Sequence, residues 1–287
     1  MNIRTDLAIE SREIHGSEDI QGVYTKVNEN RDCKATTIEI ASAEGARILG
    51  KPEGKYITLE MDSLPDSTML SDGRLELLIS SLRELIPEKG TVLAVCLGNT
   101  DITPDALGPV CGDRILATRH IPENVSASLK LPSLRSVAVV CPGVSGKTGI
   151  ETAEIISGIK EKIKPSVIIT VDALASRSIK RLGSTVQICN TGIAPGSGVG
   201  NKRTEISEKT MGVPVIAIGI PTVVDAETLA YELTGSEITN GDYKNFMITP
   251  KDTDIITSSG AAFIALGINC VLQNNLSAEE IISLTSP

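Results

Sequence analysis

Aromatic side chains are scarce in this 287-residue sequence: they make up 2% of it, and tryptophan is absent, although 41% is hydrophobic. The core must therefore be built from Val, Ile, Leu and Ala, a composition typical of a parallel sheet that helices cover on both faces. The length is sufficient for one large domain or two small ones.

Positive charge and histidine are also scarce. The net formal charge is −9 and no dense Lys/Arg stripe offsets it, so we expect no nucleic-acid partner. The two histidines, His15 and His120, are too few for a histidine metal cluster, and the six cysteines include no C-x-x-C pair. Reduced thiols are therefore expected rather than a zinc site or a disulfide framework, with no metal and no cofactor.

The N-terminal residues lack the apolar segment of a secretory signal, and no apolar run approaches the roughly 18 residues of a membrane span. We therefore expect an intracellular protein with no membrane partner. Residues 1–20 are charged and show no apolar periodicity, so they are interpreted as a poorly ordered leader.

A hairpin is predicted near the N-terminus, over 22–27 and 34–40, followed by a strand over 55–61. Apolar strands are then expected at 91–98, 136–141, 166–171, 184–189 and 213–220. Helices are expected at 72–86, 105–117, 149–163, 173–182, 223–234 and from Pro250 onward, with a surface loop at 233–245. This alternation predicts a single three-layer α/β/α domain with a mostly parallel sheet, to which the N-terminal β-hairpin is added.

Two aspartates follow strands of this predicted sheet, at the edge where open α/β sheets bind ligands. Asp105 lies in the first turn of a helix that Pro104 begins, and Asp172 follows the 166–171 strand directly. Each could simply cap a helix. If their strands are neighbours, the carboxyls approach within hydrogen-bond distance and one keeps its proton. Such a pair can activate water and polarise a carbonyl, as in aspartic proteases, or bind a divalent metal.

Glycine-rich loops at the same edge give a second group of candidates. "CPGVSGKT" and "GSGVG" nearly match phosphate-binding motifs, but the first has Cys141 where glycine is required and the second is one residue short. Turn geometry or close approach to an extended peptide accounts for the glycines better. Gly192, Gly196, Gly198 and the loop residue Asn99 are therefore candidate substrate-binding residues.

Several long motifs together resemble the spore germination protease family: "RTDLAIE", "NTDITPDALGP", "PGVSGKTGIET", "VDALASRSI", "TGIAPGSGVGNKR" and "VPVIAIGIPTVVDA". Members are endopeptidases that degrade small acid-soluble spore proteins when a bacterial spore germinates. The resemblance implies an aspartic mechanism with Asp105 and Asp172 as the catalytic pair. It also implies a homotetramer without a cofactor, in the cytoplasm of the developing forespore and the spore core.

The same resemblance implies a zymogen that cuts itself at a site like those of its substrates, roughly Thr-Glu before Phe/Ile-Ala-Ser-Glu. "TDLAIE" (5–10) has this form, which places the cut between Asp6 and Leu7. Residues 1–6 are then a propeptide and 7–287 a single peptidase domain. We expect this segment to be extended, accessible and held by few contacts.

An alternative chemistry comes from the loop "LGNTDITPDALG", which is similar to a loop of hydrogenase-maturation endopeptidases, whose fold we expect here. In those proteins acidic residues at the matching strand ends bind nickel together with a histidine. A metal-dependent peptidase or metal-binding protein on the same fold is therefore the alternative, which the missing histidine partner disfavours.

Overall fold

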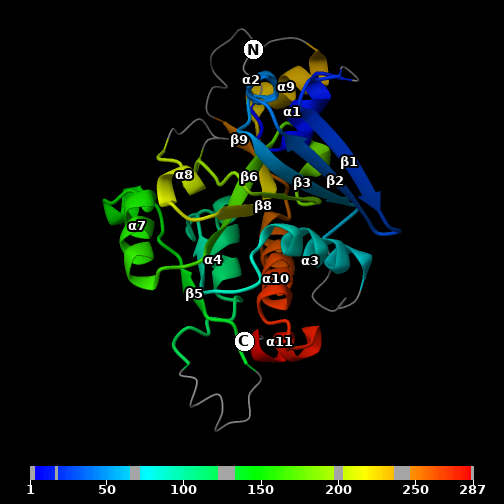
Figure 1. Ribbon diagram of the computed structural model, residues 1–287. Coiled ribbons are helices and arrows are strands. Elements are labelled where there is room, and N and C mark those ends of the chain that lie inside the picture. The colour runs from blue at the N-terminus through cyan, green and yellow to red at the C-terminus, as the bar shows by residue number, and fades with distance from the viewer. Residues whose placement is uncertain are drawn as a thin grey trace.

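The computed structural model describes residues 4–16, 19–64, 72–121, 133–196, 203–235 and 246–285, and within them it contains one nine-stranded sheet (Figure 1). The strands are β1 (Val23–Glu29), β2 (Cys33–Ile40), β3 (Gly54–Met61), β4 (Val92–Cys96), β5 (Val137–Val140), β6 (Val167–Ser176), β7 (Thr185–Cys189), β8 (Val215–Asp225) and β9 (Met247–Ile248). Their order across the sheet is β1-β2-β3-β7-β8-β6-β4-β5, and β9 pairs with β8.

The sheet has a parallel part and an antiparallel part. Strands β8, β6, β4 and β5 are parallel neighbours, whereas the β1–β2 hairpin joins them through β3 and β7, which pair antiparallel. Strand β7 cannot be parallel to β6, because only residues 177–184 separate them and a parallel crossover needs about a dozen residues or more. The predicted α/β class and N-terminal hairpin are confirmed, and the hairpin extends the main sheet.

Helices cover both faces of this sheet. They are α1 (Ala8–Ile14), α2 (Ala43–Leu49), α3 (Gly73–Leu85), α4 (Leu107–Gly112), α6 (Ser145–Thr148), α7 (Thr152–Ile163), α8 (Glu208–Met211), α9 (Ala226–Thr234), α10 (Thr253–Leu272) and α11 (Ala278–Thr285), with 3₁₀ turns η1 (Thr103–Asp105) and η2 (Ile179–Arg181). On one face α3, α4 and α10 form the largest apolar cluster, which includes Leu78, Leu107 and Ile264. Helices α7 and α8 pack on the opposite face, and α1 and α2 cover the hairpin end of that face. The three layers are thus as predicted.

Helix α10 corrects the expectation that no apolar run approaches the length of a membrane span. It is the one helix in the described ranges that is long and apolar enough, by length and composition, to cross a membrane. However, 61% of its apolar window is buried inside the protein, where it packs against α3 and α4. Such burial is typical of a core helix.

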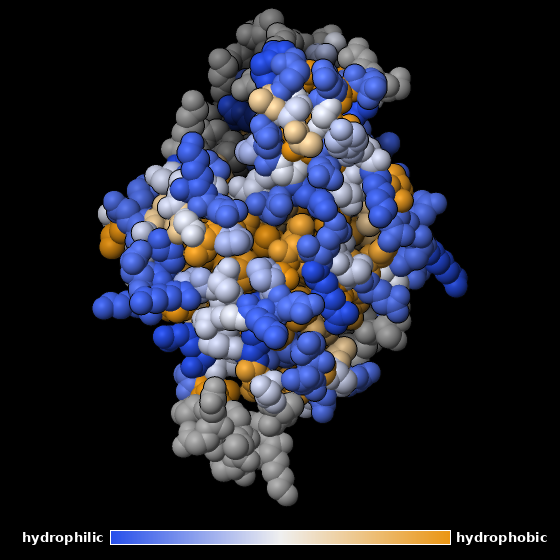
Figure 2. All heavy atoms as spheres, viewed as in Figure 1, coloured by the Kyte–Doolittle hydropathy of each residue, from blue (hydrophilic) through white to orange (hydrophobic). Residues whose placement is uncertain are grey.

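The polar surface is extensive, in keeping with the net charge of −9. Figure 2 shows polar side chains over most of the face seen in Figure 1, with apolar ones gathered near its centre. Large hydrophobic side chains that are exposed come from separate elements, among them Tyr24 in β1, Leu233 in α9 and Leu284 in α11. Single exposed hydrophobic side chains are ordinary on a folded surface and indicate no function.

Strand β6 does not end where the sequence suggested. It continues past Asp172 to Ser176, because β8 continues beside it and pairs with residues 173–176. The helix predicted over 173–182 is therefore wrong, and only the short turn η2 forms there. The helix predicted over 105–117 is also too long, since α4 ends at Gly112. Most of the loop predicted at 233–245 lies outside the described residues.

The leader is ordered where it is described, which contradicts the interpretation of residues 1–20 as a poorly ordered segment. Leu7 and Ala8 are both 0% exposed, and α1 begins at Ala8. Leu7 packs in one apolar cluster with Ile38 and Tyr56. The leader therefore belongs to the core of the described structure.

Two glycines give a matched test of how closely α4 packs on the sheet. A Cβ at Gly108 would lie 2.1 Å from the Leu97 carbonyl oxygen and 2.6 Å from that of Val171, whereas a Cβ at Gly158 in α7 would meet nothing within 4 Å. Gly108→Ala should lower the free energy of unfolding by about 2 kcal/mol or more, and Gly158→Ala should leave it unchanged or raise it by up to about 1 kcal/mol. Denaturant unfolding measures both variants. Equal effects would contradict the close packing.

Candidate active site

Asp105 is positioned by the loop between β4 and α4. The chain turns at Gly98, whose φ is +124° and where a Cβ would lie 2.0 Å from the carbonyl oxygen of Asp105, so only glycine fits. The Asn99 N–H donates to that oxygen at 3.0 Å, and the Thr222 hydroxyl donates to the Pro104 carbonyl oxygen at 2.7 Å. These bonds fix the backbone of Asp105 over the end of the sheet.

Asp172 lies inside β6, between β4 and β8. Side chains alternate along a strand, so Asp172 shares the face of Ile168 and Leu174, which is the face that α7 and α1 cover. The side chain accepts the Ala173 N–H at 2.9 Å, and the residue is 6% exposed. Opposite it in β8 is Gly219, where a Cβ would lie 2.3 Å from the Asp172 carbonyl oxygen. Asp172 is thus a buried strand residue and caps no helix.

The structure brings the two predicted acids together. Strands β4 and β6 are parallel neighbours, and Asp105 and Asp172 line one cavity of about 360 Å³. Asp6, Gly196 and Arg203 line the same cavity. The expectation that both acids reach one site is therefore met, although Asp172 lies within β6 rather than just past its end.

Burial sets the protonation of this pair. It raises the pKa of Asp172 well above the usual value, and the charges of Asp105 and Asp6 raise that pKa further. Burial also raises the pKa of Asp105, but the Asn99 N–H and the Arg203 charge oppose the increase. The pKa is raised further for Asp172 than for Asp105, so the environment favours Asp172 as the acid that keeps the proton.

The leader runs into this cavity from the side of β6. The Asp6 N–H donates to the Ala175 carbonyl oxygen at 2.9 Å, and the Ala175 N–H donates to the Asp6 carboxylate at 2.8 Å. Leu7 has extended backbone angles, φ −82° and ψ 124°. The predicted cleavage bond, Asp6–Leu7, therefore lies against the end of β6, between a bend at Asp6 and the start of α1 at Ala8.

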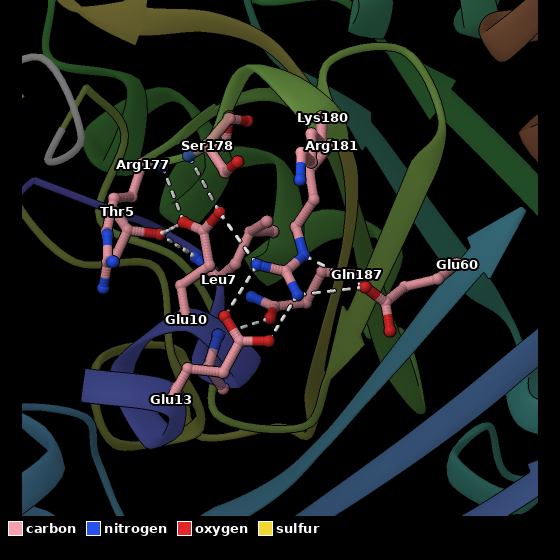
Figure 3. Close-up of polar contacts among 12 residues, drawn as sticks. Thr5, Leu7, Glu10, Glu13, Glu60, Arg177, Ser178, Lys180, Arg181 and Gln187 are labelled. Atoms are coloured by element: carbon pink, nitrogen blue, oxygen red, sulfur yellow. Dashed lines mark hydrogen bonds and ion pairs between the residues drawn. The ribbon is translucent and has the colours of Figure 1, made fainter. Parts of the chain in front are cut away.

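Figure 3 shows how the residues after that bond are anchored. The Glu10 carboxylate is fully buried, accepts the N–H groups of Arg177 at 2.6 Å and Ser178 at 3.1 Å, and accepts the Thr5 hydroxyl. Arg181 pairs with Glu10 at 3.3 Å, and it also forms ion pairs with Glu13 at 2.6 Å and with Glu60 at 3.0 Å. The expectation of an accessible leader held by few contacts is wrong, and of the expected extended conformation only Leu7 shows the backbone angles, since Asp6 is in a bend and α1 begins at Ala8.

The candidate substrate-binding residues lie in different places. Gly196 lines the cavity of the two acids and Gly192 lines a neighbouring one, whereas Gly198 is outside the described residues. At Gly192, φ is +80° and a Cβ would lie 2.1 Å from the Ile206 carbonyl oxygen, so turn geometry requires the glycine. Asn99 shapes the loop before Asp105, since its side chain accepts the Asp101 N–H at 3.1 Å.

Sequence reasoning missed three basic or amide residues of this region. Arg203 lines the cavity, and its charge opposes the increase in the pKa of Asp105. Lys51 and Gln187 donate hydrogen bonds to the leader backbone. No local pattern marks a single lysine or glutamine whose partner lies far away in the sequence. In the ranges that the structure describes, no group of three or more His, Cys, Asp or Glu is arranged to hold a metal ion.

Comparison with known proteins identifies the class of protein as a peptidase, since the sequence profile of a peptidase family described as germination protease matches residues 3–236. The chain belongs to the germination protease family. A germination protease of Clostridium perfringens (strain SM101 / Type A) is 41% identical over 98% of both chains. One from Caldanaerobacter subterraneus subsp. tengcongensis is 39% identical over 99% of this chain and 98% of its own.

Two further similarities cover less of the chain. A germination protease of Priestia megaterium is 44% identical over 79% of this chain and 65% of its own. Among solved structures, the NiFe hydrogenase maturation protease HycI from Thermococcus kodakarensis KOD1 is similar with a TM-score of 0.41 and 16% identity, over 67% of this chain and 98% of that one.

The raised pKa of Asp172 predicts that this residue lowers stability as the pH increases. An unfolded aspartate has a pKa of about 3.9, so above that pH the unfolded chain loses the Asp172 proton before the folded one does. Asp172→Asn keeps an acceptor for the Ala173 N–H and removes this cost. The variant should therefore unfold at a higher temperature than the wild type at pH 7, with a difference that shrinks toward pH 3.

Asp225 provides the control for that measurement. It caps α9 by accepting the Thr228 N–H at 3.0 Å and pairs with Arg4 at 3.2 Å. Asp225→Ala should lower stability at pH 7 by about 1 kcal/mol, as the loss of a helix cap does. Thermal unfolding at several pH values compares the variants, and a less stable Asp172→Asn protein at pH 7 would refute the assignment of Asp172 as a buried acid with a raised pKa.

Proposed function

We propose that this protein is an aspartic-type endopeptidase, made as a self-processing zymogen, that begins the degradation of small acid-soluble spore proteins during germination. One observation carries the mechanism: Asp105 and Asp172 line one cavity, and both burial and the charge of Asp105 raise the pKa of Asp172. Membership in the germination protease family supports the endopeptidase activity and its use during germination.

In this mechanism the ionised Asp105 takes a proton from a water molecule while the protonated Asp172 polarises the substrate carbonyl. The water oxygen forms a bond to the carbonyl carbon, and the carbonyl electrons move to its oxygen. When the C–N bond breaks, the proton on Asp105 passes to the leaving nitrogen. The pair then has its original protonation.

The leader supports the proposal of self-processing at Asp6–Leu7. Asp6 lines the cavity of the two acids, and its carboxylate accepts the Ala175 N–H at 2.8 Å, which holds the residue before the bond beside the end of β6. Cleavage there releases residues 1–6 and leaves a mature chain that begins at Leu7. Family membership is also the support for the proposed homotetramer and for action in the cytoplasm of the forespore and spore core.

A metal-dependent peptidase on the same fold is the second candidate. Its support is that Asp6, Asp105 and Asp172 line one cavity, since carboxylates can bind a divalent cation. Against it, these three are not arranged as a metal-binding group.

Substitution of either acid should abolish both the cleavage of substrate proteins and the self-processing of the chain. Asp105→Asn and Asp172→Asn should remain folded, fail to cut a small acid-soluble spore protein and stay full length, because each lacks one role of the pair. Asp101→Asn is the matched control, since Asp101 lies in the same loop, is exposed and pairs with Lys147 at 2.5 Å. It should keep wild-type activity.

Mass spectrometry of the fragments and of the intact chain gives the outcome of these substitutions. A mature wild-type chain should begin at Leu7. A different N-terminus, or equal clipping of the Asp172→Asn protein, would show that another site or an outside protease is responsible.

Chelation separates the two candidate functions. If the acids share a proton and no ion, the peptidase activity should be unchanged after prolonged dialysis against EDTA and 1,10-phenanthroline. Elemental analysis of the active protein should then find less than stoichiometric transition metal. Activity that disappears on chelation and returns with one divalent metal would favour the metal-dependent alternative.

A further inference from the structure

The carbonyl oxygen of Asp6, which belongs to the predicted cleavage bond, is held by two hydrogen-bond donors. The Lys51 ammonium donates to it at 3.0 Å and the Gln187 side-chain amide at 2.7 Å. Lys51 also donates to the Thr5 carbonyl oxygen at 3.0 Å, and the Gln187 oxygen accepts the Ala8 N–H at 2.7 Å. The two side chains therefore form hydrogen bonds with the backbone on both sides of the Asp6–Leu7 bond.

These donors come from separate elements. Lys51 follows the left-handed Gly50 that ends α2, and Gln187 lies in β7, where it is 6% exposed. Burial is the main cause that lowers the pKa of Lys51, and the charge of Asp6 opposes it. Placing an ammonium group in such surroundings is costly, and a neutral carbonyl oxygen compensates for that cost only in part.

We propose that Lys51 and Gln187 form the oxyanion hole for cleavage of the Asp6–Leu7 bond. When water adds to the Asp6 carbonyl carbon, negative charge develops on the oxygen that these two groups already contact. A hydrogen bond from a charged or preoriented donor strengthens as that charge grows, so the pair stabilises the transition state more than the intact peptide. This inference rests on the proposed self-processing and adds the groups that stabilise the oxygen.

A purely structural role would give the same bonds in the intact leader, because buried backbone carbonyls need donors. The two roles differ in what their loss changes. A structural pair contributes to stability, whereas an oxyanion hole contributes to the rate constant of cleavage in a protein that is still folded.

The rate constant of self-cleavage in the full chain tests the proposal, measured as the first-order conversion to the Leu7 chain by intact mass spectrometry. Lys51→Met removes the ammonium, and the near-isosteric Gln187→Glu removes the amide donor while it keeps an acceptor for the Ala8 N–H. Each should lower the rate constant about 100-fold, as the loss of one oxyanion donor does in other enzymes. Lys51→Arg, which keeps a positive donor, should recover much of the loss.

Lys160→Met is the matched control. Lys160 also donates to a backbone carbonyl oxygen, that of Met211 at 2.9 Å, but it lies in α7. It should process at the wild-type rate. Thermal unfolding of every variant fixes an assay temperature well below its unfolding transition.

The outcomes separate this inference from the function on which it rests. If Asp172→Asn stays full length while Lys51→Met and Gln187→Glu process at the wild-type rate, the oxyanion hole is overturned and the aspartic mechanism stands. If Lys51→Met and Gln187→Glu process slowly only near their unfolding transitions, and at the wild-type rate well below them, the oxyanion hole is also overturned. If Asp172→Asn processes as well, the proposed mechanism itself fails.

Discussion

The burial of one carboxyl, that of Asp172, is the constraint on which the site depends. A charged carboxylate is unfavourable in such surroundings, so its pKa increases and the proton is retained. The surroundings must then be rigid enough to keep water and counter-ions from relieving that cost. The β6–β8 pairing, which runs from Ile168 to Ser176, and the close contact with Gly219 provide this rigidity.

Most leader contacts lie on one side or the other of the predicted cleavage bond, whereas Gln187 and the Thr5–Glu10 hydrogen bond span it. Before it, Asp6 contacts Ala175, Lys51 and Gln187, close to the pair of acids. After it, the buried Glu10 carboxylate accepts the N–H groups of Arg177 and Ser178 and pairs with Arg181. Cleavage would release the first set of contacts and retain the second. The proposed mature chain would thus keep α1 in place while the space beside the acids becomes available to a substrate.

Apolar patterns in the sequence predicted most strands and helices, because burial on a sheet face or helix stripe leaves a local signal. Asp105 and Asp172 could be found in the same way, since each follows or interrupts an apolar strand. The continuation of β6 through residues 173–176 could not be predicted, because small residues there fit a helix equally well and the decision comes from pairing with β8. Helix α1 has only seven residues, and its burial depends on partners such as Ile38. Lys51 and Gln187 donate hydrogen bonds to a backbone segment that is distant in the sequence, and such contacts leave no local sequence pattern from which they could be predicted.

The central claim is that the buried Asp172 and the half-buried Asp105 form one electrostatically coupled pair. Titration of the Asp172 carboxyl by NMR tests this claim most directly. The Asp172 signal is identified by its absence from the spectrum of the Asp172→Asn variant. In the wild type it should titrate well above the ordinary aspartate pKa of about 3.9. The Asp105→Asn substitution should move that titration to lower pH, because it removes the neighbouring negative charge. An Asp172 carboxyl that titrates near the ordinary value, with no response to Asp105→Asn, would contradict the account.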